Sequence, residues 1–408
     1  MVSISPFKAL RPSAQFAREV ASRPYDVLNV SEAKAEANGK PNSFLHITRS
    51  EIDLSADIDV HNTEVYEKAK ENLNAFISRE VLFSEQKPCY YIYELVMDER
   101  SQTGLVCCSS VSDYEDGLIK KHELTRPEKE QDRVDHIFTT QAQTGNVFLA
   151  YRDINELNDI INKWKNSKSS VYNFTADDNI RHTIWVISDE KVIERITEIF
   201  VKKVPSTYIA DGHHRVASAS RVKYMLPDHK EAGKFLCTLF PASELKIMDY
   251  NRVVKDLNGH SESELIEKLR KNFSITKMPR TYKPDKPHHF GMYLNGTWYQ
   301  IVAVEGSYAT DPVNILDVSV LQNNLLEPIL GIKDQRTDPR IDFIGGIRGM
   351  KELEKLVDSG EAAIAFSIYP VTIEQLFDIA DSNNLMPPKS TWFEPKLRDG
   401  LLTHLINE

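Results

Sequence analysis

The stretch from Tyr208 to Arg215 constrains the fold more than any other, because an apolar run meets a cluster of polar side chains there. The run Tyr208-Ile209-Ala210 predicts a β-strand, and residues 216–226, which lack Gly and Pro, predict a helix. The first N–H groups of a helix that follows a strand directly are unpaired and attract anions. We call residues 208–215 the elbow.

The elbow carries side chains suited to chemistry on a phosphorylated small molecule. Asp211, at the strand end, could coordinate Mg²⁺ or hold a hydroxyl, and Arg215 can bind two phosphate oxygens. Gly212 lacks a Cβ where backbone must approach a ligand or adopt a positive φ. His213 and His214 cannot face the same way on a helix, so we expect at most one to touch the reacting group. The alternative is a simple capped turn with Asp211 as N-cap.

Length and composition predict an ordinary globular protein with two or three domains. The chain has 408 residues, of which 41% are hydrophobic and 27% charged. We expect domains at 1–245 and 246–408, the second ending in a Pro-rich tail at 386–400. A net charge of −10 argues against duplex nucleic acid as the main partner.

The cysteines and the N-terminus predict a soluble cytoplasmic protein with no membrane partner. The four cysteines form no CxxC pair, so we expect buried thiols in a reducing compartment. The first residues show no signal pattern, and nowhere do 18 apolar residues run together.

Alternating helical and strand patterns predict an α/β or α+β fold. A turn at 98–103 predicts a hairpin, and Asn295-Gly296 predicts a second, tight one. Thr372 with Gln375 predicts a capped helix over 373–380. The other expected helices lie near 64–83 and 192–204, and the other expected strands near 43–47, 89–97, 104–111, 148–151, 183–187 and 235–240.

Two further groups of residues are candidates for chemistry. In the charged run 120–133, most residues read as a solvated loop, but His122-Glu123 sets a carboxylate beside an imidazole and could act as a general base. The second group is Arg252 with the tail residues Lys389, Ser390, Thr391 and Lys396, which could close over a nucleotide or substrate. A surface salt bridge for Arg252 and a simple turn at 390–391 are the alternatives.

Several segments together resemble one uncharacterised bacterial and archaeal family whose hallmark is an ADGHHR motif. The elbow is also similar to the phosphate loop of the ParB/sulfiredoxin fold, above all in free-serine kinases of archaea. The resemblance implies an α/β (α+β) fold with a ParB/sulfiredoxin-like nucleotide-binding core, added N-terminal elements and a C-terminal α/β domain. The segments that carry it are 6–12, 24–27, 122–123, 211–215, 252–254 and 386–397.

The resemblance also implies roles for individual residues. Glu123 would be the base toward a serine hydroxyl, although the long spacing to the elbow leaves Glu64 or Glu94 open as alternatives. Asp211 would be catalytic and bind the metal, and one of His213 or His214, taken to be His214, would stabilise the transferred phosphoryl group. The nucleotide would be bound by Gly212, His213, Arg215 and Arg133, and the substrate by His122, Arg252 and Lys389.

The implied activity is a Mg²⁺-dependent exchange of phosphate between serine or O-phosphoserine and an adenine nucleotide, ATP or ADP. One direction makes O-phosphoserine, and the reverse would complete serine biosynthesis. The expected partners are therefore small molecules, with a homodimer as an open option. The alternatives are a ParB-like nucleotide-binding regulatory switch and a phosphoserine phosphatase-like hydrolase. The acidic net charge and the lack of a basic helix-turn-helix pattern weigh against the switch.

Overall fold

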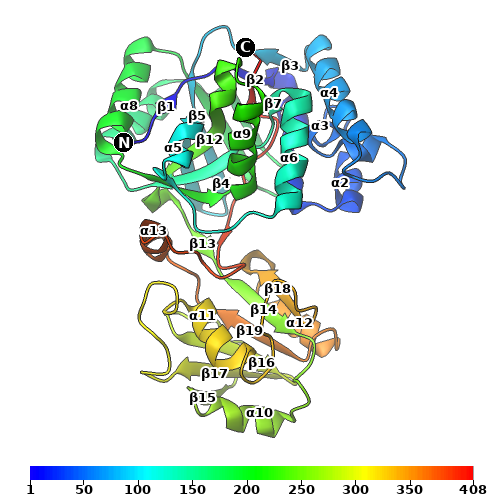
Figure 1. The fold of residues 1–408 in the computed structure, drawn as a ribbon, viewed down its shortest axis with the longest axis vertical. Helices are drawn as coiled ribbons and strands as arrows, with labels where there is room; N and C mark the ends of the chain where they lie inside the picture. Colours follow the sequence, from blue (N-terminus) through cyan, green and yellow to red (C-terminus); the bar gives the residue numbers. More distant parts are fainter. Residues whose placement is uncertain (408) are drawn as a thin grey trace. The chain divides into compact units, whose positions relative to one another are not determined.

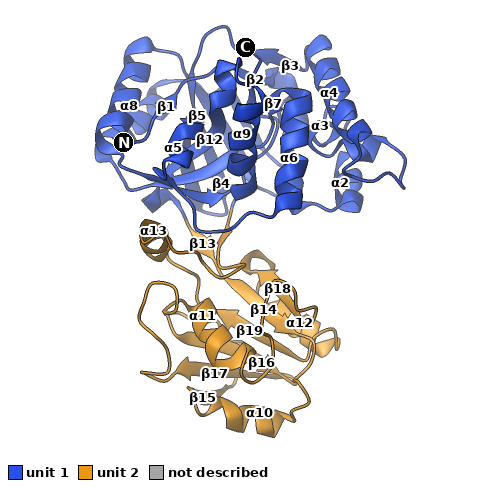
Figure 2. Ribbon diagram, in the orientation of Figure 1, with its two compact units in different colours: residues 1–245, 395–408 blue, residues 246–394 orange. Residues whose placement is uncertain are grey.

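In the computed structural model, which describes residues 1–407, the chain divides into two compact units (Figure 2). Unit 1 comprises residues 1–245 and the C-terminal segment from Pro395 onward, and unit 2 comprises residues 246–394. The sequence analysis placed all of 246–408 in one domain. That assignment is corrected for the C-terminal segment, because its strand β21 (Thr403–Leu405) pairs with β2 (Ala9–Pro12) and β7 (Ala142–Gln143) of unit 1.

A mixed nine-stranded sheet forms the centre of unit 1. Its strands follow the order β6-β11-β8-β12-β5-β4-β10-β9, and β1 also pairs with β5. A two-residue turn joins β4 to β5, and Asp98 in this turn has a φ of 54°, so the hairpin predicted here is confirmed with a shorter turn. The strand bounds are β1 Ile4–Ser5, β4 Tyr90–Met97, β5 Arg100–Ser110, β6 Ile119–Lys120, β8 Val147–Tyr151, β9 Tyr172–Thr175, β10 Arg181–Ile187, β11 Thr207–Asp211 and β12 Lys234–Pro241.

Different parts of the chain cover this sheet. Buried side chains of its strands pack with those of α5 (Val111–Glu115), α7 (Asn155–Ser167), α8 (Glu190–Lys203) and α9 (His213–Met225) in one core. Figure 1 shows α5, α9 and α6 (Pro127–Thr140) side by side. The two ends of unit 1 reach tyrosines of β4: Tyr91 accepts a hydrogen bond from the N–H of Ala9 at 3.1 Å, and Tyr93 accepts one from the N–H of Arg398 at 3.3 Å.

The N-terminal residues form a smaller layer around the four-stranded sheet β3-β2-β21-β7, where β3 spans Leu82–Ser84. The helix expected at 64–83 is present as α4 (Thr63–Ser78). The strand expected at 43–47 is wrong: residues Leu45–Thr48 form the short helix α3. A short apolar run fits a buried helix as well as a strand, and here it packs in a core against α4. The remaining helices of this layer are α1 (Ala17–Val20) and α2 (Val30–Ala37).

Unit 2 is built on an antiparallel six-stranded sheet with the order β15-β17-β16-β19-β14-β18. The tight hairpin is confirmed, since β16 and β17 meet at the pair Leu294–Thr297 and Asn295 has a φ of 44°. The capping box of Thr372 and Gln375 is also present, at the start of α13 (Ile373–Asp381). The other bounds are β13 Ile247–Met248, β14 Tyr250–Val254, α10 Glu262–Leu269, β15 Phe273–Met278, β16 His289–Leu294, β17 Thr297–Ala303, α11 Asp317–Leu321, β18 Ile341–Gly345, α12 Met350–Asp358, β19 Ile364–Ile368 and β20 Trp392–Phe393.

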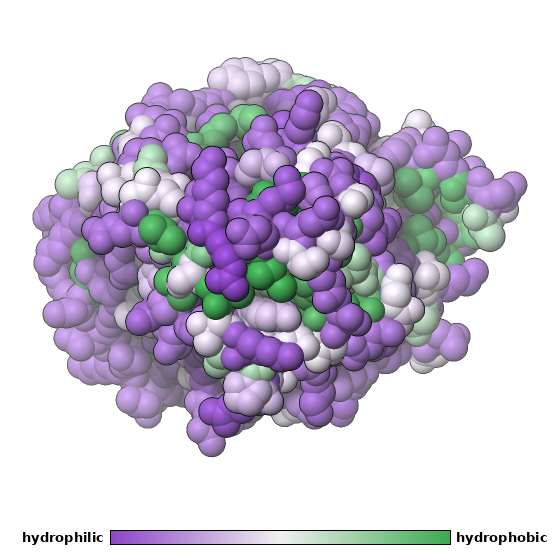
Figure 3. Space-filling model, turned by 90° about the horizontal axis from the view of Figure 1, so that it is seen from below, coloured by the Kyte–Doolittle hydropathy of each residue, from purple (hydrophilic) through white to green (hydrophobic). Residues whose placement is uncertain are grey.

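The surface and the thiols agree with the composition. On the face seen in Figure 3, hydrophilic residues predominate and hydrophobic ones gather in smaller groups between them. All four cysteines are buried and reduced. Within residues 1–407, none of the helices combines the length and the apolar character needed to span a bilayer.

Candidate active site

The elbow has the predicted strand-to-helix form. Strand β11 ends at Asp211, Gly212 adopts a φ of +99°, and α9 begins at His213, three residues earlier than predicted. Gly212 is the N-cap residue and provides no side-chain cap, so the alternative of Asp211 as N-cap does not hold. A Cβ at Gly212 would lie 3.1 Å from Arg215 Cζ and Nε, which adds a steric reason for glycine to the backbone one.

The register of two short parallel strands brings the second candidate cluster to the elbow. Strand β6 pairs with β11 so that Lys120 lies opposite Tyr208. Glu123 and Asp211 are therefore each three residues beyond the same pair, at the edge where both strands end. Parallel strands present their carboxyl ends at one edge of a sheet, which is where ligands of α/β proteins bind. Residues 88 positions apart in sequence thus follow the same strand pair.

The two elbow histidines face different parts of the loop that carries Glu123. The Nε2 atom of His213 accepts a hydrogen bond from the N–H of His122 at 3.4 Å, and its Nδ1 lies 3.8 Å from Glu123 Oε2. The Nε2 atom of His214 accepts a hydrogen bond from the N–H of Arg126 at 2.9 Å. The prediction that the two rings diverge is therefore confirmed.

His122 is buried in an unusual state. Its ring packs edge-on against the ring of His213, with centroids 4.6 Å apart and planes at 88°. Burial lowers the pKa of His122 to about 4, although the charge of Asp211 opposes the shift. Burial also holds the pKa of His213 well below its usual range, with His122 adding to the effect. Both ring nitrogens of His122 lack a hydrogen-bond partner among residues 1–407.

Asp211 is held by two cations. Its Oδ2 lies 3.0 Å from Lys396 Nζ and 3.5 Å from Arg215 Nη2. Burial alone would raise the pKa of the Asp211 carboxyl, but the charges of Lys396 and Arg215 hold that pKa below its ordinary value. Lys396 belongs to the tail group that the sequence indicated as able to close over a nucleotide or substrate. Lys396 can contact Asp211 because the C-terminal segment folds as part of unit 1.

The guanidinium of Arg215 forms hydrogen bonds and ion pairs with other groups of the protein. Its guanidinium is buried, donates to the carbonyl of Asn146 and to Asp26 Oδ2 (3.3 Å), and pairs with Asp211. These contacts place it behind the elbow, where it holds Asp211. Arg215 could contact a phosphate, as expected, only if its guanidinium were shared between the phosphate and these protein groups.

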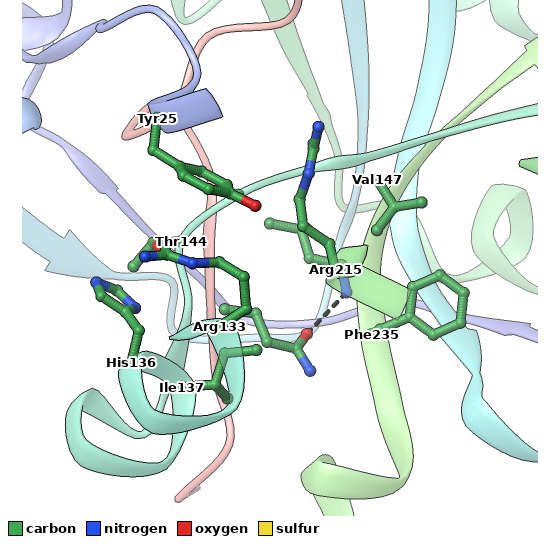
Figure 4. Close-up of a pocket in the computed structure, with 11 residues that line it drawn as sticks. Tyr25, Arg133, His136, Ile137, Thr144, Val147, Arg215 and Phe235 are labelled. Carbon is green, nitrogen blue, oxygen red and sulfur yellow. Dashed lines mark hydrogen bonds between the residues drawn. The ribbon is translucent and has the colours of Figure 1, made fainter. Parts of the chain in front are cut away.

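Arg133, on α6, also contacts other groups of the protein. It lies 2.7 Å from Asp132 Oδ2 and its guanidinium carbon is 4.0 Å from the centre of the Tyr25 ring. Arg133 and Arg215 line one small cavity together with Tyr25 (Figure 4). The cavity measures about 20 Å³, which is room for about one water molecule and far too little for a nucleotide.

Asp399 is a site neighbour that the sequence analysis missed. It is buried, and burial raises the pKa of its carboxyl to about 7, although the nearby charge of Arg215 opposes the shift. Its Oδ2 has no hydrogen-bond partner in the described chain. The only sequence signal was its place in the Pro-rich tail, in Leu397-Arg398-Asp399-Gly400.

Two expected substrate residues, Arg252 and Lys389, lie in unit 2. Arg252 is fully buried and donates from Nη2 to the carbonyls of Pro388 (3.4 Å) and Lys389 (3.1 Å). Burial lowers the pKa of Arg252 to about 9. The surface salt bridge considered as an alternative is absent in the described residues, and Arg252 instead fixes the backbone of the tail.

The alternative bases lie elsewhere in unit 1. Glu94 lies on β4 and pairs with Lys165, and Glu64 is exposed in the first turn of α4. No contact of either with the elbow occurs in the described part of the chain. A cleft of about 710 Å³ also belongs to unit 1, but residues of 15–43 and 176–178 and Arg398 line it, and no predicted site residue does.

Comparisons with solved structures give matches at low identity. A free serine kinase in complex with AMP is 13% identical with a TM-score of 0.37, and the match covers 72% of this chain and 91% of that chain. A conserved hypothetical protein from Pyrococcus furiosus is 14% identical with a TM-score of 0.36, covering 74% and 95%. SbnI with a C-terminal truncation from Staphylococcus aureus is 10% identical with a TM-score of 0.32, covering 72% and 85%.

No curated protein matches the chain. A family model does match, over residues 4–319, which include β6, the elbow and both histidine–loop contacts. The chain belongs to the family that this model describes as "Protein of unknown function (DUF1015)".

Proposed function

We propose that the protein is a Mg²⁺-dependent phosphotransferase that exchanges a phosphoryl group between serine or O-phosphoserine and an adenine nucleotide. The observation that carries the proposal is the shared sheet edge at which Glu123 and Asp211 follow paired parallel strands. A base, a metal-binding acid and a helix N-terminus are the parts that phosphoryl transfer to a hydroxyl requires. The substrate class and the ParB/sulfiredoxin-like core come from the resemblance of the elbow motif.

The start of α9 is suited to hold the phosphates. Its first internal hydrogen bond runs from the N–H of Val216 to the carbonyl of Gly212 at 3.1 Å, so the N–H groups of the preceding turn remain for an anion. Gly212 leaves the approach to this turn open. The positive end of the helix dipole and the nearby Lys396 both favour negative charge here.

Glu123 is the base in this proposal. Its side chain is 37% exposed, so a substrate hydroxyl can reach it. Glu123 takes the proton of the serine hydroxyl while the serine oxygen bonds to the terminal phosphorus of the nucleotide. The bond from that phosphorus to the bridging oxygen breaks, and a nucleotide one phosphate shorter leaves. In the reverse direction Glu123 returns the proton to the serine oxygen as the nucleotide oxygen attacks phosphoserine.

His122 is the residue we assign to the substrate. It is fully buried near Asp211 and His213, and its two ring nitrogens have no hydrogen-bond partner among residues 1–407. A neutral imidazole can donate one hydrogen bond and accept another, which suits a hydroxyl or an ammonium group. The low pKa caused by burial keeps the ring neutral at physiological pH.

Magnesium would be held by Asp211. Among residues 1–407 no three His, Cys, Asp or Glu side chains gather as a metal site, but magnesium often takes only one or two carboxylates together with phosphate oxygens. Lys396 and Arg215 keep the Asp211 carboxyl ionised, which is the form that binds a metal. The ion would supply charge neutralisation on the phosphates.

The test is a transfer assay in both directions, with phosphoserine and ADP or with serine and ATP. Glu123→Gln and Asp211→Asn should each lower kcat by about 100-fold or more, because each removes a group that acts on the reacting atoms. Glu94→Gln and Glu64→Gln are the matched controls and should retain turnover.

Three results would contradict the proposal. Loss of activity in Glu94→Gln but not in Glu123→Gln would move the base to β4. Release of phosphate from phosphoserine without any nucleotide would indicate a hydrolase. Absence of transfer with every serine and nucleotide combination would remove the proposed activity altogether.

A further inference from the structure

The loop that carries Glu123 joins the candidate base to the sheet edge. Residues 121–126 join β6 to α6 without regular structure, and Leu124 in the loop is 67% exposed. Inside this stretch the hydroxyl of Thr125 donates to Glu130 Oε2 at 3.0 Å. The position of this loop matters for a base, because even about 1 Å of misplacement lowers catalysis strongly.

Two imidazoles of the elbow hold this loop near its two ends. His213 accepts the N–H of His122 at 3.4 Å, and His214 accepts the N–H of Arg126 at 2.9 Å. Consecutive helix residues point about 100° apart, so neighbouring side chains reach separate points of the loop. The pairing His-His therefore has a geometric use that a single histidine could not serve.

The face of α9 that carries His214 also contacts α6. Ser218 Oγ donates to the carbonyl of Glu130 at 2.9 Å, and Arg221 Nη1 lies 3.2 Å from Glu130 Oε1. His214, Ser218 and Arg221 are spaced by four and three residues, so they lie along one face of the helix. This face holds α6 and the loop before it as one unit, and the histidine contact is nearest to Glu123.

The hydrogen bonds also define the protonation of both rings. An Nε2 atom that accepts an N–H carries no proton, so each neutral ring carries its proton on Nδ1. For His213 this N–H then faces Glu123 Oε2, at 3.8 Å.

We propose that His213 and His214 are positioning residues that clasp the 121–126 loop through its backbone and so fix Glu123 beside the phosphate site. The inference rests on the proposed function only for its catalytic consequence. The clasp itself is a structural claim. It assigns to His214 a role on the loop backbone instead of contact with the phosphoryl group.

The variant pair that tests the clasp is His214→Gln and His214→Leu. Glutamine can present its carbonyl oxygen near the position of Nε2 and keep an acceptor for the Arg126 N–H, whereas leucine cannot. Both keep an unbranched Cβ for the helix, and His214 is only half-buried, so both variants should fold. Ser220→Ala, on the side of α9 that contacts α5 through Glu115, is the control.

The first measurement is amide hydrogen exchange at Arg126 in the full-length protein. Losing one backbone hydrogen bond should speed exchange at Arg126 by about 5- to 10-fold in His214→Leu, with little change in His214→Gln or Ser220→Ala. Unchanged exchange in His214→Leu would overturn the clasp. Equal acceleration in the glutamine and leucine variants would overturn the role of the acceptor atom.

The second measurement is steady-state transfer. If Glu123 is mispositioned, kcat should fall about 10-fold or more in His214→Leu while KM for the nucleotide changes little, and His214→Gln should recover most of the loss. A rise in KM with kcat unchanged would instead indicate direct phosphate binding by His214 and contradict the clasp. If the wild-type protein shows no transfer but exchange responds as expected, the clasp stands and the proposed function fails.

Discussion

The ion pair between Lys396 and Asp211 gives the sharpest quantitative prediction. The two atoms are 3.0 Å apart, and the side chains are 18% and 32% exposed. At an effective dielectric constant of about 20 the bare attraction is about 5 kcal/mol, and desolvation of both groups offsets most of it. Arg215, 3.5 Å from the same carboxylate oxygen, compensates part of any loss. We therefore expect a net coupling of about 1–2 kcal/mol.

The perturbation is a double-mutant cycle with Lys396→Met and Asp211→Asn. Unfolding should be followed in urea through hydrogen exchange of β11 amides, because a chain with two units need not unfold in one step. The matched control is the pair Lys40 and Asp177, which is 2.8 Å apart but 40% and 68% exposed. Screening should keep the coupling of that pair below about 0.5 kcal/mol.

The pKa shift of Asp211 also determines how the coupling between Lys396 and Asp211 depends on pH. The cations lower the pKa of Asp211 in the folded state, so the stabilisation is present above the ordinary aspartate pKa and is lost as the pH falls through the lowered value. The coupling should thus be the same at pH 8 and pH 5. A coupling no larger than that of the control pair, or one that disappears between pH 8 and pH 5, would refute the reasoning.

Three further predictions concern stability and local order. In an Asp399→Asn background, acid should lower the urea midpoint of unit 1 between about pH 6.5 and pH 4, because burial lowers the pKa of His122 and of His136 to about 4, and a flat profile would contradict this. The background is needed because the raised pKa of Asp399 acts in the opposite direction over the same range. Gly400→Ala should destabilise the protein by about 2–4 kcal/mol in thermal unfolding, since φ is +86° and the new Cβ would lie 2.5 Å from Phe44 Cγ. Gly39→Ala, with a φ of +72° and open space, should cost only about 1 kcal/mol and serves as its control. Arg252→Met should speed amide hydrogen exchange at 389–391, because the carbonyls of Pro388 and Lys389 lose their donor and the backbone there loosens, and unchanged protection would show that other contacts hold the tail.

Local features of the sequence predicted those elements that local chemistry determines. Asn295-Gly296 can adopt two positive φ values, so the hairpin follows from the turn itself. The capping box of Thr372 and Gln375 and the strand before Asp211 are equally local. Helix α6 was missed because its dense charge resembled a solvated loop. In the structure Pro127 occupies its first turn, and Val134 and Ile137 are buried along one side.

The site could be predicted only in part, because its assembly is not local. Nothing in the residues near His122-Glu123 shows that Lys120 pairs with Tyr208, and that pairing alone decides which acids become neighbours. The same holds for Lys396 and Asp399, which reach the elbow from the far end of the chain. Side-chain chemistry indicated the candidates, and tertiary pairing selects among them.

The placement of β21 between β2 and β7 has a consequence for biosynthesis. The ribosome must complete the chain through Leu405 before β7 gains its partner in this sheet, before β2 gains a partner besides β3, and before Lys396 can reach Asp211. Unit 2 is synthesised entirely before that point, so it can fold while unit 1 still lacks its C-terminal segment. A prematurely terminated product would therefore expose the edges of β2 and β7 and lack the counter-ion of Asp211. Proteases act on such an open state, so survival of unit 1 is linked to completion of translation.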